Sequence, residues 1–140
     1  LPGIVEVVGG NPRVIVDGAH TARSAEATRA AVEARWPGET VVLLTAMLDE
    51  KDVAGVAQAL AEDVKHVVVT RVDSPRCIAP ADLAGRIESV VKAPITVQDD
   101  LAMALGRARA LAGSEGTVLA SGSIYLAGAV RTLAKPKPVV

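Results

Sequence analysis

Short apolar runs alternate along the chain with longer segments whose apolar residues recur every three or four positions. The run Val41–Leu44 has no polar interruption, which is typical of a strand inside a parallel sheet with helices on both faces. Loose alternation or short runs rich in Val and Ile indicate further strands. The six predicted strands are Ile4–Val8, Val14–Val16, Val41–Leu44, His66–Val69, Ile95–Val97 and Thr117–Ala120.

The segments between these strands carry the signals of helices. Ala22–Arg35 is rich in alanine and ends before Pro37-Gly38, a pair that stops a helix. Pro80 stands at the first position of one helix, and Asp52 is the expected N-cap of another. The five predicted helices are Ala22–Arg35, Val53–Leu60, a segment from Pro80 with Leu83, Ile87, Val90 and Val91 inward, Leu101–Leu111 after a cap at Asp99 or Asp100, and Ile124–Leu133.

The alternation of strands and helices from Val14 to Leu133 predicts an α/β fold. We expect a mostly parallel, six-stranded sheet with helices on both faces and right-handed crossovers. No helix separates the first strand from Val14, so the first strand is the expected antiparallel edge strand. The 140 residues fit a single domain, 1–140, and the sequence has no internal repeat.

Composition and charge narrow the functional classes. The formal net charge is −1 and Lys and Arg are spread along the chain, so nothing indicates a nucleic acid or a membrane surface as a partner. No apolar run reaches the ~18–20 residues of a membrane span. Cys77 is the single cysteine and cannot form an internal disulfide, which favours a reducing, cytoplasmic setting. The sequence has no phosphate-loop motif, no dinucleotide-binding glycine motif and no cluster with metal-ligand spacing.

Polar side chains follow four of the predicted strands. Ligands of open parallel sheets bind at the carboxyl ends of the strands, and these ends share one edge. We therefore expect groups that are far apart in the sequence to converge there. The four groups are Asp17 with His20, Asp49 with Lys51 and Asp52, Ser74 with Arg76, and Ser121 with Ser123.

The first two groups each allow a functional and a structural interpretation. Asp17 and His20 could orient a nucleotide, the carboxylate through ribose hydroxyls and the imidazole through a phosphate or a carboxylate. Alternatively, Asp17 caps the following helix and His20 lies in its first turn. Lys51 could reach a phosphate, and Asp49 could position Lys51 or a metal. Alternatively, the segment is a solvated loop followed by a helix cap. The residue types leave both interpretations open.

The other two groups point to anions. The planar guanidinium of Arg76 suits a carboxylate, and Pro75 stiffens its loop, but a surface arginine on a turn is the alternative. Ser121-Gly122-Ser123 precedes a helix, where bare N–H groups and the helix dipole favour an anion. An N-cap alone would also explain Ser123. These alternatives also stay open.

Five short motifs follow one another along the chain: Leu1–Gly3 with Glu6–Val7, Val16–His20, Met47–Asp52, Asp73–Arg76 and Gly122–Leu126. In their order and spacing they resemble the C-terminal domain of the folylpolyglutamate synthase/dihydrofolate synthase family, which belongs to the Mur ligase superfamily. The resemblance extends from Pro2 to Arg131. The Asp-Gly-Ala-His form of the second motif resembles the folate branch of that superfamily.

The resemblance implies a Rossmann-like, three-layer α/β/α domain that closes over a larger N-terminal ATPase domain of the same parent chain. The complete enzyme would be an ATP-dependent ligase of folate biosynthesis and one-carbon metabolism that adds L-glutamate to a reduced folate, with dihydrofolate synthase as a second activity. ATP and Mg²⁺, bound mainly by the N-terminal domain, would serve to phosphorylate the folate carboxylate, which the glutamate amine then attacks. The isolated domain would be inactive.

The resemblance also implies roles for individual residues. His20 is the expected catalytic residue, near the phosphates or the glutamate, and no metal ligand is expected in this chain. The expected nucleotide-binding residues are Asp17, His20 and Lys51. The expected glutamate-binding residues are Ser74, Arg76 and Ser123.

Two positions depart from the family pattern. Ile4 stands where the family usually has an Arg that helps to bind ATP, and Thr21 stands where it usually has Asn. These departures keep open a non-catalytic α/β module that binds a nucleotide or a metabolite, and also a purely structural domain. The chain begins with Leu1, which favours either a piece of a longer polypeptide or N-terminal processing. A phosphate loop upstream in the same reading frame would favour the ligase.

Overall fold

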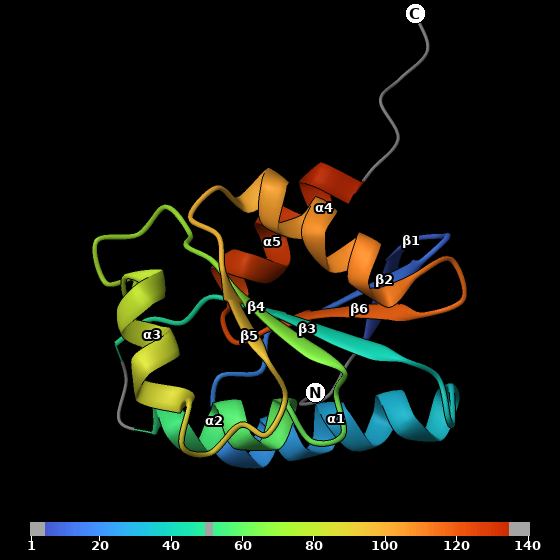
Figure 1. Ribbon diagram of the computed structural model, residues 1–140, viewed down its shortest axis with the longest axis horizontal. Helices are drawn as coiled ribbons and strands as arrows, with labels where there is room; N and C mark the ends of the chain where they lie inside the picture. Colours follow the sequence, from blue (N-terminus) through green and yellow to red (C-terminus); the bar gives the residue numbers. More distant parts are fainter. Residues whose placement is uncertain (1–4, 50–51, 135–140) are drawn as a thin grey trace, which may run out of the picture.

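A six-stranded sheet forms the middle layer of the protein, with helices above and below it (Figure 1). The computed structural model describes residues 5–49 and 52–134. Along the sheet the strands lie in the order β1-β2-β6-β3-β4-β5. They are β1 Glu6–Gly9, β2 Arg13–Asp17, β3 Val41–Thr45, β4 His66–Val69, β5 Ile95–Val97 and β6 Thr117–Ser121.

The directions of the strands match the predicted sheet. β1 runs antiparallel to β2 at one edge, whereas the other four strand pairs are parallel. The turn between β1 and β2 is too short for the crossover that a parallel pair needs, and it contains a cis peptide bond between Asn11 and Pro12. The predicted antiparallel edge strand is therefore confirmed. It begins at Glu6, and Ile4 lies outside the described residues.

The described part of the chain has five helices, as predicted; α1 to α4 connect successive strands and α5 follows β6. α1, α2 and α3 cover one face of the sheet, and α4 and α5 cover the other (Figure 1). Each of these helices is too short to cross a bilayer. They are α1 Ala22–Arg35, α2 Val53–Leu60, α3 Pro80–Ile87, α4 Leu101–Ala112 and α5 Ile124–Ala134.

α3 is shorter than the sequence pattern predicts. It ends at Ile87, whose carbonyl then accepts hydrogen bonds from the N–H groups of Val90 (3.0 Å) and Val91 (3.1 Å) in the turns that follow. Pro94 disfavours helical backbone at the residue before it, and β5 begins directly after it. Val91 is buried and Val90 partly buried, so both lie inward as predicted, but neither belongs to the helix.

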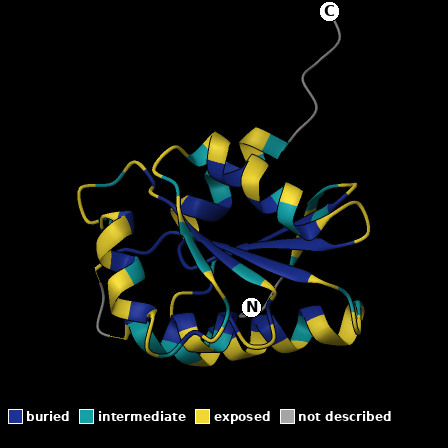
Figure 2. Ribbon diagram, in the orientation of Figure 1, coloured by how far each residue is buried: buried dark blue, intermediate teal, exposed yellow. Residues whose placement is uncertain are grey.

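The sheet separates two hydrophobic clusters. Ile15, Leu43 and Leu119 face α1 and α2, whereas Leu44 faces α4 and α5, because successive side chains of a strand point to opposite faces. β3 and β6 are buried along their whole length, and the outer faces of the helices are exposed (Figure 2). The prediction of a strand covered on both faces at Val41–Leu44 is confirmed.

His66, at the start of β4, gives the fold a pH dependence. Its Nε2 lies 2.6 Å from Thr96 Oγ1, and burial together with nearby Arg107 and Lys65 lowers the pKa of the imidazole. The unfolded chain therefore takes up a proton here at a higher pH than the folded chain does, so stability falls as the pH drops below the ordinary histidine pKa of 6.5. We expect His66→Gln to lose less stability than the original chain between about pH 7.5 and about pH 5.5, measured by urea unfolding.

The comparison of the original chain with His66→Gln is controlled by the other histidine of the sequence. This histidine, His20, is exposed and is the same in both chains, so any contribution from it cancels. Gln is preferred to Ala at position 66 because it keeps a polar group near Thr96 Oγ1. Equal losses of stability in the two chains on acidification would contradict the assignment to His66.

Candidate active site

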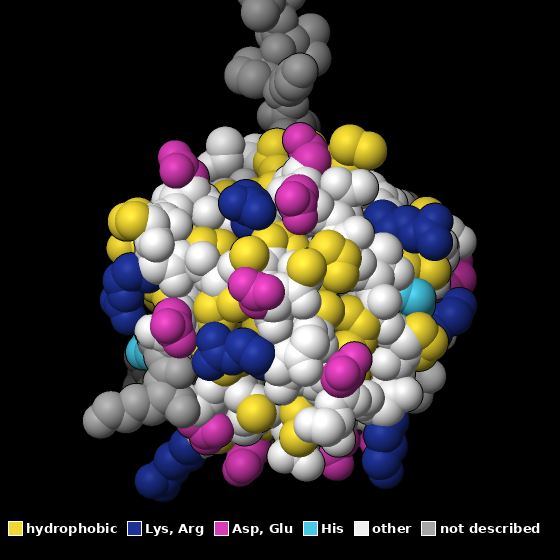
Figure 3. Space-filling model, turned by 60° about the vertical axis from the view of Figure 1, so that its left-hand side comes forward, with side chains coloured by type: hydrophobic (Ala, Val, Ile, Leu, Met, Phe, Trp, Pro, Cys, Tyr) yellow, Lys and Arg dark blue, Asp and Glu magenta, His cyan; other side chains and the backbone are white. Residues whose placement is uncertain are grey.

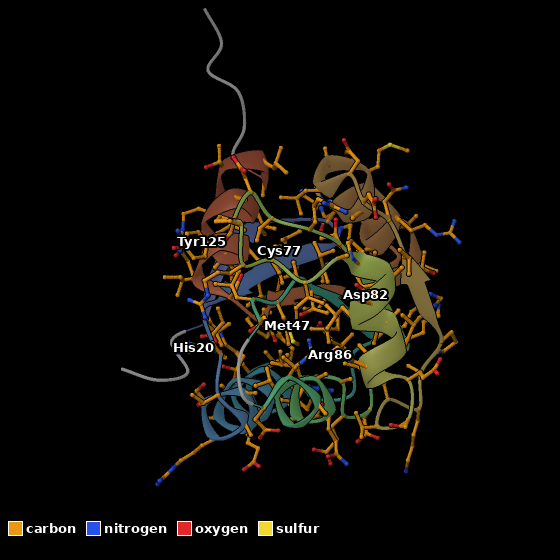
Figure 4. All side chains as sticks on the ribbon, turned by 90° about the vertical axis from the view of Figure 1, so that its left-hand side faces the viewer. His20, Met47, Cys77, Asp82, Arg86 and Tyr125 are labelled. Atoms are coloured by element: carbon orange, nitrogen blue, oxygen red, sulfur yellow. The ribbon has the colours of Figure 1, made fainter. Side chains whose placement is uncertain are left out.

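Four loops with polar residues gather at the carboxyl edge of the sheet. Asp17 pairs with Ser121 across β2 and β6, and β3 and β4 continue the parallel register. Figure 4 looks onto this edge and shows His20, Met47 and Cys77 on the side turned to the viewer. The structure thus places loops from distant parts of the sequence on one side of the protein. We call residues 18–21, 46–49, 73–79 and 122–123 the carboxyl rim.

Asp17 is buried and holds the turn after β2. It is 5% exposed, and its Oδ2 accepts hydrogen bonds from the Ala19 N–H (2.8 Å) and the Thr28 hydroxyl (2.6 Å). The N-cap of α1 is Thr21, which forms a capping box with Ser24. The interpretation of Asp17 as the helix cap is therefore wrong, and its carboxylate instead ties the turn to the second turn of α1.

His20 is exposed directly before the N-cap of α1. Its Nδ1 lies 3.1 Å from the Gly18 carbonyl oxygen. Because a carbonyl can only accept, Nδ1 carries the proton in the neutral imidazole and Nε2 offers its lone pair. His20 lines a small pocket together with Met47, Val53 and Gly122. This pocket has a volume of only about 10 Å³, so a ligand that donates a hydrogen bond to Nε2 would approach from the exposed side of His20.

Gly122 lets the turn between β6 and α5 approach β3 closely. Its φ is +130°, and a Cβ added there would overlap Thr45 Oγ1 and lie 3.2 Å from the Ala46 carbonyl oxygen. A Cβ added at Gly18 would lie 2.9 Å from Ile124 Cγ2. These two glycines therefore allow the loops that follow β2, β3 and β6 to pack against one another.

Buried hydroxyl groups lie at this contact. Ser123 is 3% exposed, and its Oγ accepts a hydrogen bond from the Leu126 N–H (3.0 Å), so Ser123 has the contact of an N-cap. Thr45 Oγ1 and Ser121 Oγ are buried without a hydrogen-bond partner among residues 5–49 and 52–134. Sequence reasoning included Ser121 but missed Thr45, whose only signal is its place at the end of a buried apolar run.

A short antiparallel bridge joins the loop after β3 to the loop after β4. Leu48 pairs with Cys77, and the Asp49 N–H donates to the Arg76 carbonyl oxygen (2.9 Å). Backbone hydrogen bonds thus hold the two rim loops together.

The predicted phosphate-binding residue of this region, Lys51, lies outside the described residues. Asp52 follows it and caps α2, because its Oδ1 accepts a hydrogen bond from the Gly55 N–H (3.0 Å). The prediction of an N-cap at Asp52 is confirmed. This carboxylate therefore has a structural contact at the N-terminus of α2.

Ser74 and Arg76 lie on the loop after β4. The Ser74 Oγ accepts a hydrogen bond from the Arg76 N–H (3.2 Å), which shapes the turn. The guanidinium of Arg76 is exposed, and its Nη2 lies 3.4 Å from the Asp49 carbonyl oxygen. Within the described ranges, no carboxylate lies within 4.0 Å of this guanidinium. Its charge is therefore available to an anion.

A groove next to Arg76 contains residues that sequence reasoning missed. It has a volume of about 980 Å³ and runs between the loop after β4 and α3, with Asp49, Asp82 and Arg86 among its lining residues. The Arg86 Nη1 lies 3.4 Å from Asp49 Oδ1. The spacing of four between Asp82 and Arg86, on the exposed side of the predicted helix, was the only signal in the sequence.

The predicted site residues fall into two groups along the rim. His20 and Ser123 follow the neighbouring strands β2 and β6, whereas Ser74 and Arg76 follow β4. Three strand spacings of about 4.8 Å put the ends of β2 and β4 about 14 Å apart. Ser123 therefore stands with His20 rather than with the other two residues expected to bind glutamate. The bridged loop after β3 lies between the two groups.

Charges on this side of the protein are mixed. Figure 3 shows acidic and basic side chains interspersed over the face that it presents. In the described part of the chain, no group of three or more His, Cys, Asp or Glu residues could hold a metal ion. A Mg²⁺ ion that accompanies ATP would need several oxygen ligands from elsewhere.

Comparison with known proteins identifies the family. The family described as Mur ligase, glutamate ligase domain, matches residues 5–124. The chain belongs to this family. Three of the five motifs that carry the resemblance lie fully within the described residues, namely Val16–His20, Asp73–Arg76 and Gly122–Leu126. The other two lie there in part, because residues 1–4 and 50–51 are not described.

Two curated relatives of this Mur ligase domain have related names. It is 34% identical over 131 residues to the "Probable bifunctional folylpolyglutamate synthase/dihydropteroate synthase" of Haloferax volcanii. It is 30% identical over 125 residues to the "Dihydrofolate synthase/folylpolyglutamate synthase" of Escherichia coli. These matches cover 94% and 89% of this chain but 15% and 28% of the two relatives. The Mur ligase domain thus spans less than a third of either relative.

Solved structures agree with this assignment. Mycobacterium tuberculosis folylpolyglutamate synthase complexed with ADP matches with a TM-score of 0.88 at 27% identity, over 99% of this chain and 33% of that one. E. coli FolC in complex with DHPP and ADP matches with a TM-score of 0.82 at 29% identity, over 95% and 31% of the two chains. The predicted Rossmann-like, three-layer fold and the resemblance to the C-terminal domain of folylpolyglutamate synthases are confirmed.

Proposed function

We propose that this Mur ligase domain works in an ATP-dependent ligase that adds L-glutamate to a reduced folate, a folylpolyglutamate synthase with dihydrofolate synthase as a second activity. The observation that carries the proposal is the match, over 99% of the chain, to a folylpolyglutamate synthase complexed with ADP. Both curated relatives carry the name of the same activity. A cytoplasmic setting, argued from the single Cys77, belongs to this proposal.

The domain has a partner in this proposal, a larger N-terminal ATPase domain of the same parent chain. That domain holds the phosphate loop and the Mg²⁺ ion, for which the described residues have no ligand cluster. ATP supplies the phosphoryl group that activates the folate carboxylate. The carboxyl rim closes over this site and excludes water from the activated group.

His20 is the catalytic residue of the proposed reaction. Its Nε2 has a free lone pair at the exposed rim, where it contacts a phosphate or takes a hydrogen bond from the glutamate amine. Asp17 supports the nucleotide site by holding the turn that carries His20, since its Oδ2 is already occupied by Ala19 and Thr28. Lys51 stays a predicted phosphate contact.

Ser74 and Arg76 bind glutamate in this proposal, whereas Ser123, which is buried beside His20, stays a predicted glutamate contact without support from its position. Arg76 has the clearest support, because its exposed guanidinium has no carboxylate partner within the described ranges. The Ser74 Oγ accepts the Arg76 N–H, so its hydroxyl hydrogen can donate to a carboxylate held by Arg76.

Thr21 bears on the alternative function, a diverged module that binds a nucleotide or a metabolite without catalysis. It stands in place of the usual Asn of the family, but it caps α1 and forms a capping box. Asn and Thr are both good N-caps. The replacement therefore keeps the local geometry that presents His20, which favours the ligase.

The test is turnover by the full-length protein encoded by this gene. With tetrahydrofolate, L-glutamate and MgATP, we expect ADP release that requires both other substrates. His20→Ala should lower kcat by about 100-fold or more. His66→Gln, at the opposite end of the sheet, should keep the original kcat. Turnover that does not depend on glutamate and folate would contradict the proposal, and nucleotide binding without turnover would support the alternative module.

A further inference from the structure

The groove beside α3 contains two arginines that contact one residue, Asp49. Arg76 Nη2 lies 3.4 Å from the Asp49 carbonyl oxygen, and Arg86 Nη1 lies 3.4 Å from Asp49 Oδ1. Strong charge-assisted hydrogen bonds measure about 2.7–2.9 Å, so both contacts are long. The side chains of Asp49 and Arg86 are 75% and 43% exposed, and water screens such a pair. Another carboxylate can therefore replace Asp49 at Arg86 at little cost.

The shape of the groove leaves room for a ligand between the two arginines. One wall is the loop that carries Arg76, and the other is α3, which presents the small residues Ala81 and Gly85. A Cβ added at Gly85 would meet no atom within 4 Å. Figure 4 shows Arg86 on the side of α3 that faces Met47 and the centre of the rim.

The charges of the groove favour an acidic amino acid. Each guanidinium presents a planar fork of donors that matches a carboxylate. Asp82 lines the same groove and, among the described residues, has no hydrogen bond or ion pair. Its charge disfavours ligands with negative groups only, such as phosphate, and is compatible with a ligand that also has an ammonium group. A dicarboxylic amino acid has one carboxylate for each of the two arginines and an ammonium group that is compatible with Asp82.

We propose that Arg86 is a specificity-determining residue that binds the side-chain carboxylate of the incoming glutamate, while Arg76 binds its α-carboxylate. The bridge between the rim loops holds Arg76 nearer the centre of the rim than Arg86. The reacting α-amine of the amino acid therefore lies next to Arg76. Asp49 occupies Arg86 until the ligand displaces it, and so acts as an internal competitor. This inference rests on the proposed function, because it assigns the groove to the glutamate of that reaction.

Three variants of the full-length protein test the proposal by steady-state kinetics. Arg86→Gln should raise the KM for glutamate by about 10- to 100-fold with little change in kcat or in the KM for ATP, because the lost contact is a hydrogen bond to a charged group. It should also weaken the preference for glutamate over glutamine. Arg86→Lys should restore part of the affinity. Asp49→Asn should change the KM in the opposite direction and lower it, because it frees Arg86.

Arg71→Gln is the matched control. Arg71 forms a similar exposed ion pair with Asp99, at 3.5 Å, but lies outside the groove, and its loss should leave all constants unchanged. If the Asp49–Arg86 pair were purely structural, Arg86→Gln and Asp49→Asn would change the KM for glutamate in the same direction, and that result would overturn the inference. An unchanged KM for glutamate in Arg86→Gln would overturn this inference but not the proposed function. If the unsubstituted protein does not use glutamate at all, the proposed function and this inference both fail.

Discussion

Replacing Gly122 with alanine is expected to lower the free energy of unfolding by about 3 kcal/mol. The φ of +130° costs a side-chain-bearing residue about 1–3 kcal/mol. The new Cβ would overlap Thr45 Oγ1 and lie 3.3 Å from Met47 Cγ, and such overpacking costs about another 1–3 kcal/mol. β3 cannot move away easily because it is buried on both faces. Urea unfolding followed by the fluorescence of Trp36, the single tryptophan, measures the loss.

Gly128→Ala is the matched control for this prediction. Gly128 lies in the helix that follows the same turn, and a Cβ there would meet no atom within 4 Å. Alanine favours helical backbone over glycine by about 0.5–1 kcal/mol, so this variant should be as stable as the original chain or slightly more stable. A Gly122→Ala chain within about 0.5 kcal/mol of the original would contradict the close packing of the turn on β3.

The sequence was sufficient for the order and type of the elements because each signal has a local cause. The unbroken apolar run Val41–Leu44 belongs to a strand covered on both faces, and the caps at Asp52 and Asp100 lie at predicted positions. The end of α3 was not predictable in the same way. Val91 stays inward after Ile87 whether the backbone continues as a helix or as tight turns, so periodicity does not separate the two.

The site shows the same limit more strongly. Parallel strands bring their following loops to one edge, so the convergence of the rim could be expected from the pattern alone. The partners of individual atoms could not. Thr28 reaches Asp17 from the second turn of α1, and Arg86 reaches Asp49 from the exposed side of α3. Both contacts depend on how the helix is rotated about its axis on the sheet. The period of apolar residues shows which face of a helix is inward, but not its exact rotation.

Asp17→Ala is expected to lower the free energy of unfolding by about 3 kcal/mol. The change leaves the Ala19 N–H and the Thr28 hydroxyl without their shared acceptor, and a buried donor without a partner costs about 1–3 kcal/mol. Asp17→Asn keeps an oxygen at the same place and should lose only about 1 kcal/mol. The control is Asp73→Ala, an exposed carboxylate in the loop after β4, which should stay within about 0.5 kcal/mol of the original chain.

A double-mutant cycle with Thr28→Val separates the hydrogen bond from other effects of the substitution. Thr28→Val removes the hydroxyl donor but leaves the bond from the Ala19 N–H to Asp17, so its loss should be smaller than that of Asp17→Ala. In the double variant the loss should fall short of the sum of the two single losses, because both changes remove the same bond. Strictly additive losses would show that the two side chains do not interact. A clear coupling would show that the hydrogen bond from Thr28 to Asp17 ties the turn after β2 to α1.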